Sequence, residues 1–158
     1  MKATNRIQIL GSFDRLFSTA SDIARWPEIL PHYRWVKILE RMGSDIRAEM
    51  AARHRGVPLW WRTILRPRPV EKRIYFTHIG GITKGMEVYW SFTPLTPSPA
   101  PAGDDEKETW FVEIHHEFNP SWPPPGKWFA EKVIGQKFVQ EVANKTLTRM
   151  KDVIESGT

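Results

Sequence analysis

Histidines stand out because they fall within the most apolar strand-like segments of this sequence. Three runs, residues 73–80, 84–92 and 109–118, alternate in the way typical of β-strands. Successive strand side chains point to opposite faces, so His78 and His116 share a face with large apolar residues. The shared faces carry Ile74, Phe76 and His78; Met86, Val88, Trp90 and Phe92; and Trp110, Val112, Ile114, His116 and Phe118. A solid core has no need of imidazoles, whereas a concave sheet that binds an apolar molecule through a few polar groups does.

Two kinds of chemistry are open to these histidines. Imidazole titrates near neutral pH, so His78 and His116 are candidates for moving a proton in catalysis. The structural alternative is a core imidazole that donates to a backbone carbonyl. His54 falls on the same predicted inward face, and three imidazoles can bind zinc. No carboxylate shares that face at a suitable spacing, so we expect no metal ion and no cofactor.

Glycine, proline and helix-capping residues divide the chain into the elements that must position these side chains. We expect a strand over 6–10, short helices over 13–19 and from 21 or 22 to 25, a structured loop over 26–31, and strands over 32–41, 45–54 and 59–65. Pro67 and Pro69 are expected to end the last of these strands. From 128 to 154 apolar residues recur at helical spacing, which predicts one long amphipathic helix. This order predicts an α+β fold in which a curved antiparallel sheet of about seven strands wraps the terminal helix.

Composition limits the classes of protein to which the chain can belong. Its 158 residues suit a single domain over 1–158, and 8 Trp with 8 Phe supply many large rings. The formal charge of +5 is scattered along the chain, so nucleic acid is not an expected partner. The chain has no cysteine, no signal-like start and no run of membrane-spanning length. We expect a soluble cytoplasmic protein for which transient membrane contact is possible and whose oligomeric state is open.

Two proline-rich loops differ in their predicted roles. Residues 93–107 combine four prolines with glycine and acidic residues, which predicts a mobile, solvent-facing hairpin tip. Residues 119–126 are stiff with proline but contain Trp122, and they lead directly into the long helical pattern. We expect Trp122 and Trp26, both flanked by proline, to lie at the mouth of a cavity.

The order of elements and several short segments resemble the helix-grip fold of the START-like, or SRPBCC, superfamily, in particular its polyketide cyclase/dehydrase branch. The resemblance covers nearly the whole chain. It rests on residues 22–27 (DIARWP), Trp60-Trp61-Arg62 before Leu65 and Pro67, residues 73–76 (RIYF), Gly85-Met86 with Trp90 and Phe92, and residues 115–118 (HHEF).

This resemblance implies a ligand cavity between the concave face of the sheet and the long helix. In aromatase/cyclases of this type, an arginine on the fourth strand is thought to steer a poly-β-ketone chain towards ring closure, and by position Arg62 matches it best. Arg62 would then stabilise an enolate while His78 or His116 moves the proton. The alternative for Arg62 is an ion pair with Glu49. The residues expected to contact the ligand are Trp60, Phe76, Met86, Val88, Trp90, Trp110, Ile114, Ile134 and Phe138.

Two functions from different classes remain open at this point. One is a cofactor-independent polyketide cyclase or aromatase-dehydrase acting on a poly-β-ketone. The other is a protein that binds or transports an apolar lipid or quinone without changing it. A weaker alternative is a ribosome-associated interaction protein, which the scattered basic residues do not favour.

Overall fold

The computed structural model describes residues 1–95, 107–120 and 122–157. Seven antiparallel strands form one sheet in the order β1-β7-β6-β5-β4-β3-β2. The strands are β1 (Lys2–Gly11), β2 (Tyr33–Met42), β3 (Asp45–His54), β4 (Val57–Arg68), β5 (Arg73–Gly81), β6 (Met86–Pro94) and β7 (Glu108–Phe118). The helices are α1 (Phe13–Ser21), the 3-10 helix η1 (Ile23–Arg25), α2 (Trp26–Ile29), α3 (Gly126–Val133) and α4 (Gln136–Ser156). The predicted α+β helix-grip architecture is confirmed.

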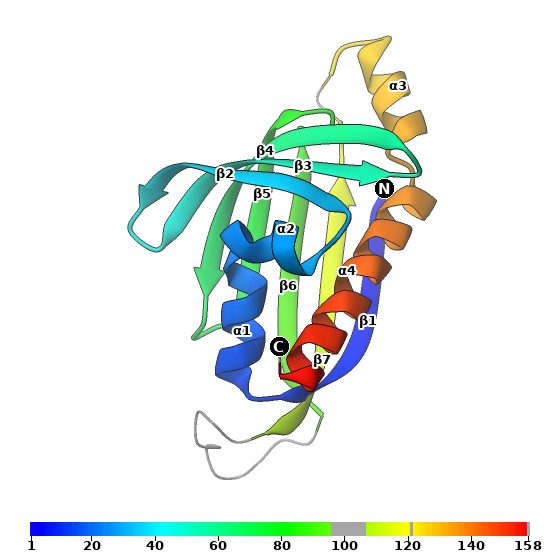
Figure 1. Ribbon diagram of the computed structural model, residues 1–158. Helices are drawn as coiled ribbons and strands as arrows, with labels where there is room; N and C mark the ends of the chain where they lie inside the picture. The colour runs from blue at the N-terminus through cyan, green and yellow to red at the C-terminus, as the bar shows by residue number, and fades with distance from the viewer. Residues whose placement is uncertain (96–106, 121, 158) are drawn as a thin grey trace.

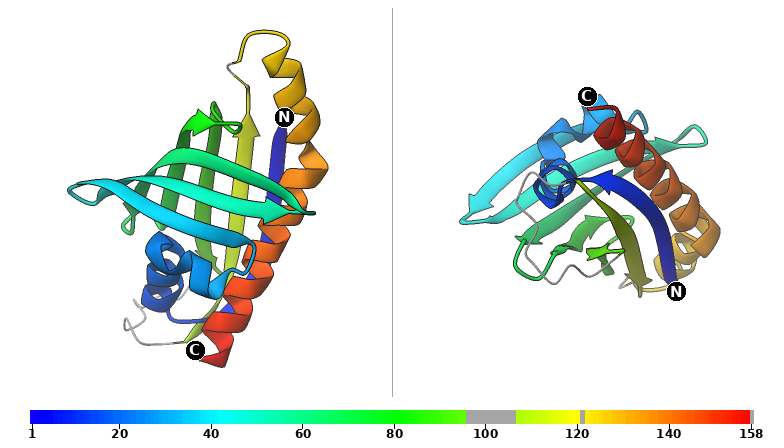
Figure 2. Two further views of the ribbon diagram at one scale, coloured as in Figure 1. Left: turned by 45° about the horizontal axis from the view of Figure 1, so that its top comes forward. Right: turned by 90° about the horizontal axis from the view of Figure 1, so that it is seen from below.

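The sheet curls strongly, and α4 runs along its open side next to β1 (Figures 1 and 2). Asn5 of β1 is buried, and its amide nitrogen donates to Asn144 Oδ1 at 2.7 Å and to the Gln140 carbonyl at 3.1 Å. Near the other end of α4, Lys151 Nζ donates to the Gln8 carbonyl at 2.8 Å. These contacts hold the helix across the concave face, whose inward side chains then form the core.

The short helices α1 and α2 pack against the concave face of the sheet beside α4. Ser12 caps α1 by accepting from the Arg15 backbone N–H, a common way to satisfy the first turn of a helix. Within α1, Phe17 packs 5.7 Å from Phe92 between ring centroids. Residues 26–31 were expected to be a loop, but Trp26–Ile29 form a helical turn. Pro27 is compatible with that turn because the first helical residues need no N–H donor.

The long terminal helix predicted over 128–154 is in fact two helices. The chain leaves helical geometry at Ile134, and Gly135 precedes α4 in an extended conformation. Glycine is a poor helix former, and the break places Ile134 in the core with only 1% of its surface exposed. The break therefore separates a short α3 from the helix that lies on the sheet.

Two strand ends also differ from expectation. Strand β4 continues through Pro67 to Arg68. Its pairing with β3 ends at Leu65, so beyond that residue β4 pairs only with β5. Pro67 is tolerated there because a proline can lie in a strand where one side is unpaired. Thr93 and Pro94, expected at the start of the mobile loop, belong to β6. Residues 96–106 of that expected loop lie outside the described residues.

Candidate functional site

A cavity of about 90 Å³ lies between the concave face of the sheet and α4. Strands β3 to β7 supply one wall and α4 supplies the other, while Trp26 and Tyr33 approach from the α2 end. Its lining consists mainly of apolar and aromatic side chains, interrupted by histidines and threonines. The apolar lining residues are Trp26, Tyr33, Met50, Ala52, Leu59, Trp61, Phe76, Met86, Val88, Trp90, Ile114, Ile134, Phe138, Val139, Val142 and Ala143.

Four histidines, His32, His54, His78 and His116, line this cavity. The period-two alternation of β5 and β7 predicted the inward positions of His78 and His116, and that of β3 predicted His54. His32 was not among the expected site residues: it was placed at the first position of the strand expected over 32–41, but it lies in the turn before β2.

The hydrogen bonds of two histidines are made to threonine hydroxyls rather than to the backbone. His78 Nδ1 lies 2.7 Å from Thr83 Oγ1. His32 Nε2 lies 3.0 Å from Thr146 Oγ1, whose own proton is donated to the Val142 carbonyl, so His32 is the donor in this pair. These bonds fix the orientation of both rings within the cavity.

Burial keeps three of these imidazoles uncharged. It lowers the pKa of His78 to about 3, and the neighbouring His116 lowers it further. Burial likewise lowers the pKa of His116 to about 4, with a contribution from His115, and the pKa of His32 to about 4, with contributions from Lys145 and His54. All three are therefore neutral at pH 7. A neutral imidazole can donate one hydrogen bond through one nitrogen and accept another through the other.

The hydrogen-bond partner of His54 is a carboxylate at the end of the cavity. Its Nε2 donates to Glu141 Oε2 at 2.9 Å, and Arg55 donates to the other oxygen of Glu141 at 2.6 Å. Desolvation raises the pKa of Glu141, but the hydrogen bond from His54 and the charge of Arg55 outweigh it, so the pKa lies below its usual value. Within the described part of the chain, the Nδ1 atoms of His54 and His116 are buried without a hydrogen-bond partner.

Aromatic rings give the cavity flat walls. The Trp61 and His78 rings are stacked, with centroids 5.7 Å apart and planes 14° from parallel. Trp26 lies 5.8 Å from Phe76 and 5.9 Å from Trp90 between centroids. Such surfaces favour a planar aromatic partner, which gains dispersion and ring contacts on both sides.

Ten of the fourteen residues expected at the site line the cavity: Trp26, Phe76, His78, Met86, Val88, Trp90, Ile114, His116, Ile134 and Phe138. Trp26 was expected at the mouth, but it is buried and belongs to the wall. The expectation did not include Tyr33, Trp61, Thr83 or Thr146. Trp61 could have been found by alternation with Leu59 and Leu65, which share its face.

Arg62 and Trp60 lie outside the cavity, which corrects the catalytic position expected for Arg62. Trp61 points inward, and adjacent strand residues alternate, so both of its neighbours point to the opposite face of the sheet. There, Arg62 Nε donates to Glu49 Oε2 at 2.8 Å, and its guanidinium lies 5.8 Å from the Trp60 ring centroid. The alternative ion pair with Glu49 is the arrangement observed.

Trp110 and Trp122 also lie away from the cavity lining. Trp110 is buried, but its ring packs 5.4 Å from that of Phe13 at the α1 end of the sheet. Trp122 is exposed beside α3.

No three histidine or carboxylate side chains among the described residues come close enough together to hold a metal ion.

Known proteins share both the sequence pattern and the fold of this chain. The family described as polyketide cyclase / dehydrase and lipid transport matches residues 11–151. The chain belongs to this family. No curated protein is similar enough in sequence to count as a match.

No helix of the described chain is long and apolar enough to cross a membrane.

Several solved structures have a fold similar to that of this chain. The TTHA0849 protein of Thermus thermophilus is 17% identical with a TM-score of 0.73, over 100% of this chain and 99% of that one. The Zhui aromatase/cyclase of Streptomyces sp. R1128 is 14% identical with a TM-score of 0.72, over 98% and 93%. A START superfamily protein of Mycobacterium smegmatis is 20% identical with a TM-score of 0.69, over 99% of each chain. At these identities the likeness concerns the fold.

Proposed function

We propose that this protein binds a neutral, largely apolar aromatic molecule between the sheet and α4. The observation that carries the proposal is the pair His78 and His116, two imidazoles kept neutral by burial within an aromatic wall. Neutral imidazoles offer hydrogen bonds to a hydroxyl or carbonyl oxygen without requiring a charge on the ligand. An apolar pocket with a few oriented polar groups is typical of small-molecule sites.

The charge distribution supports a neutral ligand. Among the described lining residues the only lysine or arginine is Arg53, whose side chain is exposed. A carboxylate or phosphate buried between Trp61 and Trp90 would have no cation to balance it, and an unpaired buried charge is strongly unfavourable.

The cavity must widen to accept such a molecule. Its volume of about 90 Å³ is below the roughly 300–1,000 Å³ typical of small-molecule sites. Phe138 is only partly buried, and its ring contacts that of His54 at 4.7 Å between centroids. Ile134 lies at the break between α3 and α4, and Phe138 lies in the first turn of α4 that follows it. Outward movement of these two side chains enlarges the cavity without disturbing the sheet.

Ring closure and dehydration of a poly-β-ketone is the catalytic version of this function, and membership of the family favours it. His78 and His116 line the same cavity, so one imidazole can accept an α-proton while the other donates a hydrogen bond to the carbonyl. With pKa values of about 3 and about 4, both imidazoles are weak bases, and neither supplies an imidazolium acid at pH 7. The binding function is therefore primary, and catalysis is tested by the product distribution after co-expression of His78→Gln and His116→Gln variants with a minimal polyketide synthase. A distribution unchanged in both variants argues for binding without chemistry.

Calorimetric titration with three naphthalenes tests the binding function. They share one ring system but carry no substituent (naphthalene), a neutral hydroxyl (1-naphthol) or a sulfonate (1-naphthalenesulfonate). We expect 1-naphthol to bind best and the sulfonate worst. Ala143→Leu fills the cavity from α4 and should weaken 1-naphthol binding by about tenfold or more. Arg62→Ala, on the opposite face, serves as the control.

The proposal fails if the sulfonate binds as tightly as 1-naphthol. It also fails if Ala143→Leu and Arg62→Ala have the same effect on 1-naphthol affinity.

A further inference from the structure

Helix α3 exposes an aromatic surface that the other described residues do not cover. Ala130 is its only buried residue, while Trp128 and Phe129 are 62% and 56% exposed. Trp122, 43% exposed, comes just before the helix. The five exposed Trp and Phe side chains of the described residues are Trp35, Trp60, Trp122, Trp128 and Phe129. Three of them thus fall within eight positions of the chain.

These three rings belong to one structural unit. A Cβ added to Gly126 would lie 3.4 Å from the Trp122 Cβ and 3.9 Å from its ring, so Trp122 packs on the first turn of α3. The Lys127 and Phe129 backbone N–H groups donate to the carbonyls of Pro123 and Pro125. The proline segment and α3 therefore move and dock together. We call this unit, residues 122–133, the α3 tip.

The α3 tip also carries positive charge. Lys127 and Lys132 flank Trp128, and the Lys132 ammonium lies 4.8 Å from the Trp128 ring centroid. Glu131 is the only acidic residue of the tip, and Lys137 follows at the start of α4. Tryptophan and lysine are the side chains that prefer the boundary between lipid headgroups and acyl chains, because each has an apolar body and a polar end.

We propose that the α3 tip docks on the surface of a bilayer that contains anionic lipids. Trp122, Trp128 and Phe129 would enter the headgroup region, and Lys127 and Lys132 would contact lipid phosphates. The helix is two turns long, so it lies in the interface rather than crossing the bilayer. This proposal goes beyond ligand binding in the cavity and does not depend on it.

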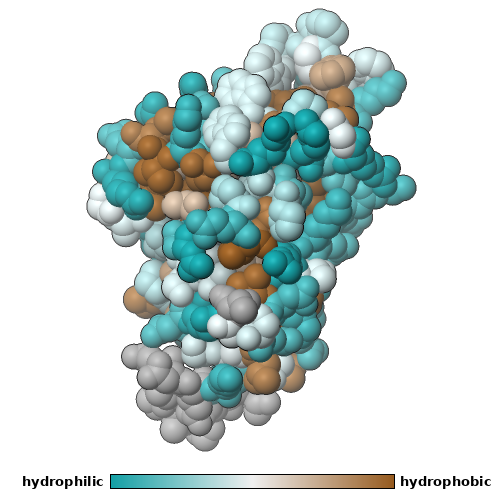
Figure 3. Space-filling model, in the orientation of Figure 1, coloured by the Kyte–Doolittle hydropathy of each residue, from teal (hydrophilic) through white to brown (hydrophobic). Residues whose placement is uncertain are grey.

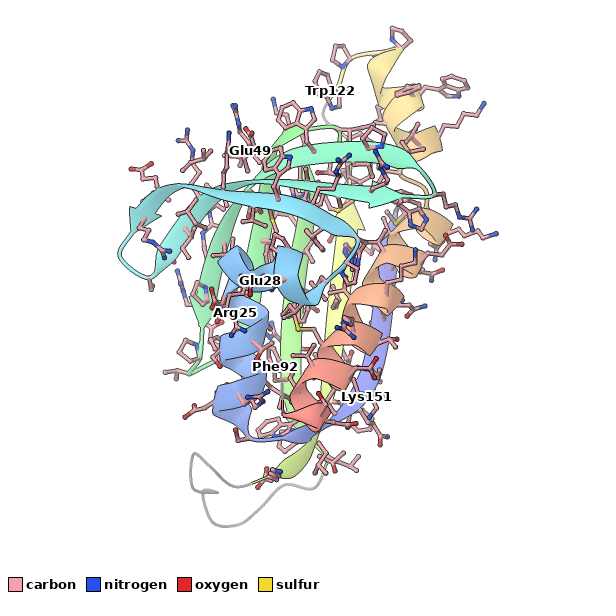
Figure 4. The ribbon with its side chains drawn as sticks, in the orientation of Figure 1. Arg25, Glu28, Glu49, Phe92, Trp122 and Lys151 are labelled. Carbon is pink, nitrogen blue, oxygen red and sulfur yellow. The ribbon has the colours of Figure 1, made fainter. Side chains whose placement is uncertain are left out.

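The shape of the molecule favours a lipid surface over a protein partner. The α3 tip projects beyond the end of the sheet (Figures 1 and 2), and Trp122 lies at this end, far from Phe92 in the interior (Figure 4). The surface around α3 is mostly pale with a little brown, whereas the outer face of α4 is mostly hydrophilic (Figure 3). A projecting helix with exposed Trp, Phe and Lys side chains suits insertion between lipid headgroups.

The test is flotation of the full chain with vesicles of phosphatidylcholine alone or mixed with phosphatidylglycerol. We expect binding to the mixed vesicles, weakened about tenfold by Trp128→Ala combined with Phe129→Ala. Replacing Lys127 and Lys132 by glutamine should weaken binding to the anionic vesicles by about fivefold per lysine. Trp60→Ala removes an exposed ring elsewhere and should leave binding unchanged, and circular dichroism verifies that every variant is folded.

Three results would overturn the proposal. One is the absence of vesicle binding by the folded chain, which would leave α3 as a surface for a protein partner. Another is an equal loss of binding for Trp60→Ala and the α3 double variant. The third is a dimer in light scattering that dissociates in the α3 double variant, because the rings would then be covered by a second copy of the chain.

Discussion

His54 and Glu141 join the tip of the β3–β4 hairpin to α4 at the edge of the cavity. The 2.9 Å bond from His54 Nε2 uses one carboxylate oxygen, and Arg55 binds the other. His54 also packs against Phe138, so one imidazole contacts both the ion pair and the lining of the cavity. The hairpin tip thereby holds the first turns of α4 against the sheet.

Glu141→Ala is expected to destabilise the protein more than Glu49→Ala does. Both changes remove a carboxylate paired with an arginine, but only the first leaves a buried imidazole without its partner. An unpartnered buried polar group costs about 1–3 kcal/mol, whereas an exposed ion pair contributes about 0–1 kcal/mol. Urea unfolding of the two variants measures the difference. Equal midpoints would mean that the His54 bond contributes nothing to the fold.

Acid should destabilise the protein before its carboxylates are protonated. The pKa values of His78 and His116 are about 3 and about 4 in the folded chain, below the unperturbed 6.5. As the pH falls below 6.5 the unfolded chain takes up protons that the folded chain cannot, so the free energy of unfolding decreases with falling pH. His32, whose pKa is also lowered to about 4, behaves in the same way. Three such groups give a slope of about 3–4 kcal/mol per pH unit between about pH 6 and pH 4.5.

Urea midpoints across this pH range measure the slope, and His116→Gln should reduce it by about a third. His115→Gln, the neighbouring change on the opposite face, leaves the buried pair in place and is the control. A stability that does not change between pH 6 and pH 4.5 would contradict the neutral, buried state of these imidazoles.

Regular alternation is what allowed much of the fold and of the cavity wall to be predicted. In β5, β6 and β7 each strand has one clearly apolar face, so Phe76, Met86 and Ile114 could be grouped by alternation alone. In β4 the pattern is ambiguous, because Trp60 and Trp61 are adjacent and the inward face includes the polar Thr63. Arg62 was placed in the site by its resemblance to the family's fourth-strand arginine, whereas the alternation of Leu59, Trp61 and Leu65 puts it on the opposite face.

Contacts between distant segments could not be predicted from local pattern. His32 reaches the cavity because its ring bonds to Thr146, which is 114 positions away in the chain. The break at Gly135 was hidden because apolar spacing continues through both helices. Trp122 was expected at the mouth of the cavity because its proline neighbours identify a loop, but they do not fix the direction in which the ring points.

Gly81 should tolerate a side chain much less well than Gly43. Both have a positive φ, of 81° and 64°, which alone costs an alanine about 1–2 kcal/mol. At Gly81 a Cβ would also overlap the Trp60 carbonyl and lie 2.7 Å from the Cα of Trp61, whereas at Gly43 it meets no atom within 4 Å. Thermal melting should therefore show a clearly larger loss for Gly81→Ala than for Gly43→Ala. Similar losses would mean that β5 can shift away from β4 at this point.

The most direct test of the proposed cavity is to follow the tryptophan indole N–H resonances during titration with 1-naphthol. Binding between the sheet and α4 should shift the resonances of Trp26, Trp61 and Trp90, which line the cavity. Those of Trp35 and Trp60, which are exposed on the sheet, should not move. Shifts confined to Trp122 and Trp128, or no shifts at saturating 1-naphthol, would contradict a ligand site between the sheet and α4.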